Sequence, residues 1–66
     1  MRKVGIIALI KKAMANEENI HWDGTINWNW VSADVYIDNS EQKLGHDEDT
    51  LHEVINAYAD LYERAK

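Results

Sequence analysis

The sequence predicts a single α+β domain in which a helix, two or three antiparallel strands and a second helix follow one another, αββ(β)α. Three observations predict this class: an apolar run near the N-terminus, an Asp-Gly turn signal in a stretch rich in β-branched and aromatic residues, and a helical apolar rhythm in the last third. A chain of 66 residues is too short for two hydrophobic cores, so residues 1–66 are expected to form one domain.

The first element is predicted to be a helix from Lys3 to about Glu18, because its apolar residues recur at helical spacing with Lys11 and Lys12 on the opposite side. The apolar positions of this helix are Ile6, Ile7, Ile10, Ala13 and Met14. Residues 4–10 also form a continuous apolar run, which fits a buried strand equally well.

The centre of the chain is predicted to be a β-hairpin. Residues 20–22 and 25–28 flank Asp23-Gly24, a pair that tolerates the positive φ of a two-residue hairpin turn. The second strand is expected to continue to about Asp38, which makes it long for a strand.

The apolar face of this long strand changes midway. Its first half places apolar residues on one face and its second half on the other: Ile26, Trp28 and Trp30, then Val31, Ala33, Val35 and Ile37. A period of two cannot change phase without an extra residue, so a bulge is predicted at residues 30–32. Residues 38–40 are then predicted to turn, and residues 41–44 to return as a short third strand.

The last element is predicted to be a helix from Asp47 to Arg64. Its buried face follows the 3, 4, 7 rhythm and comprises Leu51, Val54, Ile55, Tyr58, Leu61, Tyr62 and Ala65. Acidic residues at its start and Arg64 at its end complement the helix dipole. Thr50 and Glu53 also match a capping box. Both predicted helices are expected to cover one face of the sheet.

Charge is the feature that departs most from an ordinary domain. The net charge is −5, and residues 13–63 contain all twelve acidic side chains but only one basic residue, Lys43. Such a chain repels phosphate backbones and favours basic partners, so direct binding to nucleic acid is disfavoured. The expected acidic footprint for a partner comprises Glu17, Glu18, Asp23, Asp34, Asp38, Glu41, Asp47, Glu48 and Asp49.

The aromatic residues support two interpretations. Trp22, Trp28 and Trp30 lie within nine residues, and a small domain without Phe needs such side chains as core. Exposed, they would instead anchor a partner together with Tyr36. Exposed tryptophans also suit a carbohydrate or small-ligand binder, and an uncovered sheet face suits a homodimer.

Catalytic and metal-binding patterns are absent from the sequence. The three glycines are scattered, no nucleophile motif occurs, and His21, His46 and His52 have no zinc-ligand spacing. We therefore expect a non-enzymatic protein with no metal and no cofactor. The absence of cysteine indicates a reducing cytoplasm, and no stretch is long enough to span a membrane.

Together these observations predict a small acidic binding protein that inhibits or modulates a basic partner, one that handles nucleic acid, by placing carboxylates where phosphates would lie. Phage or mobile-element origin would suit that mode of action. The alternatives are a dimerisation module and a carbohydrate or small-ligand binder.

Overall fold

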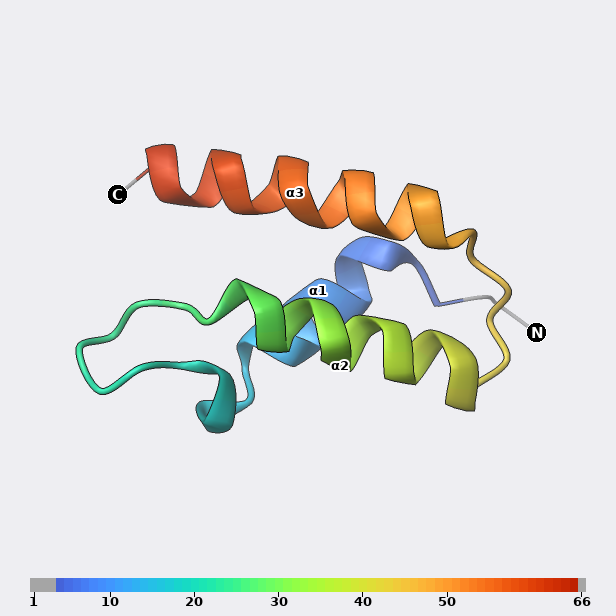
Figure 1. Ribbon diagram of the computed structural model, residues 1–66, viewed down its shortest axis with the longest axis horizontal. Helices are drawn as coiled ribbons and strands as arrows, with labels where there is room; N and C mark the ends of the chain where they lie inside the picture. Colours follow the sequence, from blue (N-terminus) through green and yellow to red (C-terminus); the bar gives the residue numbers. More distant parts are fainter. Residues whose placement is uncertain (1–3, 66) are drawn as a thin grey trace.

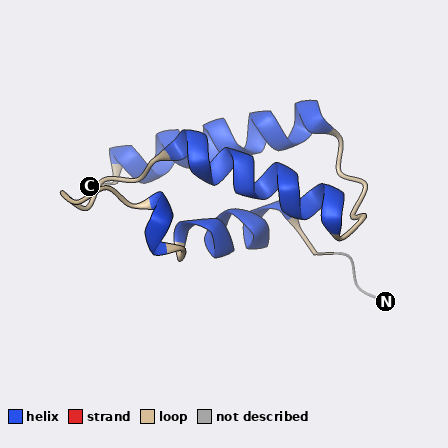
Figure 2. Ribbon diagram, turned by 60° about the horizontal axis from the view of Figure 1, so that its bottom comes forward, coloured by secondary structure: helices blue, strands red, loops and turns tan. Residues whose placement is uncertain are grey.

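The described part of the chain, residues 4–65, folds into three α-helices and a short 3₁₀ turn in the computed structural model (Figure 1). In chain order these elements are α1 (Ile6–Met14), η1 (Glu17–Asn19), α2 (Trp28–Glu41) and α3 (Glu48–Arg64). Residues 4–65 contain no β-sheet, and their only β-type pairing is an isolated bridge between Ile20 and Ile26 (Figure 2). The predicted α+β class is therefore wrong, and the architecture is a small helical bundle.

Helix α1 decides between the two structures that the apolar run allowed. Residues 6–14 are helical, and Leu9, Ile10 and Ala13 are buried on one face. The predicted helix was too long, because the chain turns after Met14 and Asn16 caps η1 by accepting a hydrogen bond from the Glu18 amide. The predicted start at Lys3 lies outside the described residues.

Helix α2 replaces most of the predicted second strand. The Asn27 side chain caps its first turn by accepting from the Trp30 amide at 3.2 Å, as helix N-caps do. Val31 and Val35 face the core one helical turn apart, with Trp28 partly buried beside them. The change of apolar phase therefore marks two faces of a helix, and the predicted bulge at residues 30–32 is wrong.

The predicted third strand at residues 41–44 is also wrong. This segment ends α2 and reverses the chain through Lys43, whose φ is +53°, and Gly45, whose φ is +76°. The Asn39 side chain closes the reversal by bonding both the amide and the carbonyl of His46, each at 3.0 Å. The His46 ring in turn lies 2.7 Å from the Val4 carbonyl oxygen.

Helix α3 confirms the C-terminal helix to within one residue at its start. Asp47 is the N-cap and accepts from the Thr50 amide at 3.1 Å, in place of the predicted capping box. Leu51 and Ile55 are buried as predicted. Tyr58 still packs against the core and the Tyr62 ring lies edge-on to Trp28, but Leu61 is 67% exposed, so its predicted place on the buried face is wrong.

One core holds the three helices together. It is built from residues of all three: Leu9, Ile10, Ala13, Val31, Val35, Leu51 and Ile55. Helices α2 and α3 run in opposite directions, and the loop of residues 20–27 lies at the same end of the molecule as the end of α3 (Figures 1 and 2). The turn between α2 and α3 lies at the other end. No helix in residues 4–65 combines the length and apolar character needed to cross a membrane.

Candidate functional site

The loop between η1 and α2 is a tightly bonded reversal. The His21 amide donates to the Thr25 carbonyl at 2.8 Å, and the Gly24 amide donates to the His21 carbonyl at 2.9 Å. The hairpin thus has a three-residue loop, Trp22 to Gly24, with Gly24 at φ +88° as in a turn followed by a glycine bulge. The predicted reversal at Asp23-Gly24 is present, but its two-residue turn and its flanking strands are not.

This register places Trp22 at the tip of the loop. A two-residue turn would have left Trp22 in a strand, where its indole could pack under a helix. In the three-residue loop its side chain is 98% exposed, the most exposed of the large apolar side chains in residues 4–65. Trp22 therefore adds nothing to the core and is free to contact another molecule.

Asp23 stabilises the loop through two hydrogen bonds from Thr25. Its Oδ1 accepts from the Thr25 amide at 3.0 Å and from the Thr25 hydroxyl at 2.7 Å. These two hydrogen bonds, the hydroxyl first, lower the pKa of Asp23 below its ordinary value of 3.8, and His21 adds a smaller electrostatic contribution in the same direction. Thr25 was missed as a loop determinant, although an aspartate two residues before a threonine is an Asx-turn signal.

A group whose pKa is lowered in the folded state stabilises that state above its unfolded pKa and loses this effect as the pH falls through the folded pKa. We therefore expect the loop bonds to weaken as the pH falls through the lowered pKa of Asp23, which lies below 3.8. In an NMR pH titration the Thr25 amide should shift with a midpoint below that value. Asp23→Asn keeps an acceptor oxygen but should abolish this titration. A wild-type midpoint at or above 3.8 would contradict the bonding described.

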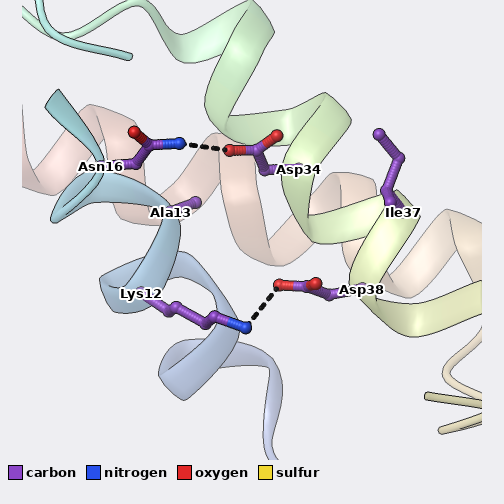
Figure 3. Close-up of a pocket in the computed structure, with 6 residues that line it drawn as sticks. All are labelled: Lys12, Ala13, Asn16, Asp34, Ile37 and Asp38. Carbon is purple, nitrogen blue, oxygen red and sulfur yellow. Dashed lines mark hydrogen bonds and ion pairs between the residues drawn. The ribbon is translucent and has the colours of Figure 1, made fainter. Parts of the chain in front are cut away.

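A groove of about 360 Å³ runs between α1 and α2 (Figure 3). Its lining residues are Lys12, Ala13, Asn16, Asp34, Ile37 and Asp38. Asp34 accepts from the buried Asn19 amide group at 2.7 Å and from Asn16 at 3.5 Å, while Lys12 pairs with Asp38 at 3.5 Å. Amide donors and one exposed lysine thus fix the orientation of two half-buried carboxylates.

The predicted acidic residues fall into four groups. Asp34, Asp38 and Glu41 lie at positions i, i+4 and i+7 of α2, so they share a side of the helix. Glu17 and Glu18 form η1, next to Asn16 of the groove. Asp23, on the loop, is the third group. The fourth group comprises Asp47, Glu48 and Asp49 at the start of α3, at the other end of the molecule from the loop (Figure 1).

The predicted aromatic anchors differ in exposure. Trp30 is 55% exposed on the first turn of α2, whereas Trp28 is partly buried with its ring edge-on to Tyr58 and Tyr62. Tyr36 packs partly against the core, and its hydroxyl donates to the Glu48 carbonyl at 3.5 Å. Trp28 and Tyr36 therefore serve the fold, and Trp22 and Trp30 present surface.

Within residues 4–65, no group of three or more His, Cys, Asp or Glu side chains is placed to hold a metal ion. Residues 4–65 bring together a groove with convergent polar groups and a loop with an exposed indole. Comparison with protein-family models, with curated proteins and with solved structures finds no match to this chain.

Proposed function

We propose that the protein is a small non-enzymatic binding protein of the cytoplasm that inhibits or modulates a basic partner, one that handles nucleic acid. The carboxylates along the α1–α2 groove would occupy positions that the partner keeps for phosphates. The observation that carries this proposal is the row formed by Asp34, Asp38 and Glu41 on one side of α2.

The spacing of this row suits recognition by several cations. With a rise of about 1.5 Å per residue, Asp38 and Glu41 lie about 6 Å and about 10 Å from Asp34 along the helix axis. Glu17 and Glu18 of η1 extend the negative charge beyond the groove. Lys12 is the one cationic side chain among the groove-lining residues, so it leaves most of this charge uncompensated.

Hydrogen bonding inside the groove favours binding further. Because Asn19 and Asn16 hold the Asp34 carboxylate, little side-chain entropy is lost when a partner's arginine or lysine pairs with it. Attraction between oppositely charged surfaces speeds encounter and weakens as salt screens it.

The test compares two variants with equal charge. The groove variant carries three substitutions beside the groove: Glu17→Gln, Glu18→Gln and Glu41→Gln. The α3 variant carries three on α3: Glu48→Gln, Asp49→Asn and Glu53→Gln. Each variant changes the net charge of the chain from −5 to −2. In affinity capture from lysate, we expect the groove variant to recover about tenfold less nucleic-acid-handling protein than wild type. The α3 variant should recover nearly as much as wild type, because the proposed interface follows η1 and α2 and leaves out the part of the expected footprint at Asp47, Glu48 and Asp49. Recovery should fall strongly between about 50 mM and about 500 mM salt.

Equal losses in the two variants would show that net charge alone attracts the partner, and unchanged recovery in both would contradict the proposal. Either variant must first show the wild-type helical circular dichroism spectrum.

Self-association is the second candidate function. Trp30, Ala33 and Ile37 are exposed on α2 at positions i, i+3 and i+7, and a second copy could bury this apolar stripe. Light scattering on the same preparations distinguishes the two, because a stable homodimer at micromolar concentration would favour the dimerisation module.

A further inference from the structure

We propose that Trp22 is the anchor of the interface: its indole enters a pocket of the basic partner that stacks nucleic acid bases, with Asp23 beside it in the place of a phosphate. This inference rests on the proposed function for the basic character of the partner.

The first argument is exposure. A tryptophan that is 98% exposed leaves nearly its whole apolar surface in water, and that surface becomes available for burial in a complex. Tryptophan is among the residues most enriched where a few side chains dominate binding energy. Other bulky residues of the central segment, Trp28 and Tyr36, pack against the core, so the exposure of Trp22 does not reflect a general lack of cover.

The second argument is the rigidity of the loop that carries the indole. The base of the loop is closed by the Ile20–Ile26 bridge and by the Asn27 amide, which donates to the Asn19 carbonyl at 2.8 Å. The tip is closed by the Asp23 bonds to Thr25. A loop held at its base and at its tip presents its side chain with little further loss of conformational entropy, which favours affinity.

The third argument is charge, which indicates what kind of partner binds the loop. Asp23 follows Trp22 directly, Glu17 and Glu18 precede the loop, and the one basic residue of segment 13–63 is Lys43. In a symmetric dimer through this loop the same carboxylates would face each other and repel. Anionic lipid surfaces would repel them too. A pocket rimmed by lysine and arginine would attract them.

Grooves that bind single-stranded nucleic acid have this chemistry. They combine a positive track for the backbone with aromatic side chains on which bases stack, and stacking tolerates any flat π-system. An indole next to a carboxylate has the same two parts as a nucleotide, a flat ring and a negative charge. The Trp22-Asp23 pair therefore fits a base-stacking position in such a groove.

The experiment compares Trp22→Ala with Trp22→Phe and with Leu61→Ala, a control at an exposed apolar side chain that belongs to no proposed interface. We expect Trp22→Ala to weaken binding to the captured basic protein about thirtyfold, the range for a residue that dominates an interface. Trp22→Phe, which keeps a flat ring, should retain most of the affinity, and Leu61→Ala should stay within about threefold of wild type. Because Trp22 lies outside the core, its variants are expected to fold normally, which circular dichroism checks.

Photo-crosslinking then locates the indole. With p-benzoyl-L-phenylalanine at position 22, crosslinks should fall on the captured basic protein and disappear when excess oligothymidylate is added. Crosslinks that join two copies of this chain would overturn the inference in favour of self-association.

Wild-type affinity in Trp22→Ala, together with a loss in the groove variant, would overturn the inference and leave the proposed function standing. Failure of wild type to recover any basic protein in a salt-sensitive manner would remove both.

Discussion

Replacing Leu51 with alanine is expected to lower the free energy of unfolding by about 2–5 kcal/mol, the range for removing a buried leucine side chain. Leu51 is fully buried and lies in the single core that α1, α2 and α3 share. A domain of this length has roughly 3–5 kcal/mol of net stability from one core. Leu51→Ala should therefore leave a large fraction of the molecules unfolded at room temperature, as measured by helical circular dichroism in a urea titration.

Leu61→Ala is the matched control, because it makes the same chemical change in the same helix. Leu61 is exposed, so the change in unfolding free energy should stay within about 0.5 kcal/mol. Similar losses in the two variants would contradict the position of the core.

Replacing Asn19 with alanine is expected to lower the free energy of unfolding by about 2–3 kcal/mol, because bonds to charged groups and orphaned buried acceptors both carry large penalties. Asn19 is 2% exposed, and its side-chain amide donates to the Ala13 carbonyl at 2.9 Å and to Asp34 at 2.7 Å. One amide group thus joins the end of α1 to the side of α2. The urea midpoint of Asn19→Ala measures the loss.

Asn29→Ala serves as the control, since Asn29 is exposed on the first turn of α2, and its effect should be small. The variants Asn19→Ala, Asp34→Ala and the double variant form a cycle that isolates the bond between these two side chains. Additive effects in this cycle would show that the 2.7 Å contact contributes nothing to stability.

The helix at the C-terminus could be predicted from the sequence because its apolar residues recur at helical spacing, whereas the apolar run that contains α1 fitted a strand equally well and Ile7 is 43% exposed. In α3 the rhythm through Leu51 and Ile55 matches burial, and Asp47 marks the start of the helix. Helix α2 could not be recognised in this way, because apolar residues occur on both its faces: Val31 and Val35 inside, Trp30 and Ile37 outside. Valine, tryptophan and isoleucine also favour strands, and tertiary packing overrides that preference here.

The candidate site was predictable only in its composition. The sequence identifies acidic residues and tryptophans as candidates for a partner surface, but which carboxylates gather depends on the helical geometry of α2, and Trp28 packs against the core. Asp34 and Asp38 meet in one groove because they lie one turn apart on a helix, whereas in a strand they would have shared a face as more distant neighbours. The exposure of Trp22 depended on one residue of turn register, which no periodicity encodes.

The three tryptophans lie in neighbouring parts of the structure. Trp22, Trp28 and Trp30 belong to the loop and the adjoining turn of α2, and Trp28 touches Tyr58 and Tyr62. Tryptophan fluorescence therefore reports unfolding at the end of the molecule that carries the loop, and it does not report unfolding near Asp47. Far-ultraviolet circular dichroism averages over the entire backbone. Coincident unfolding curves from the two signals would therefore show that both ends of the molecule unfold together.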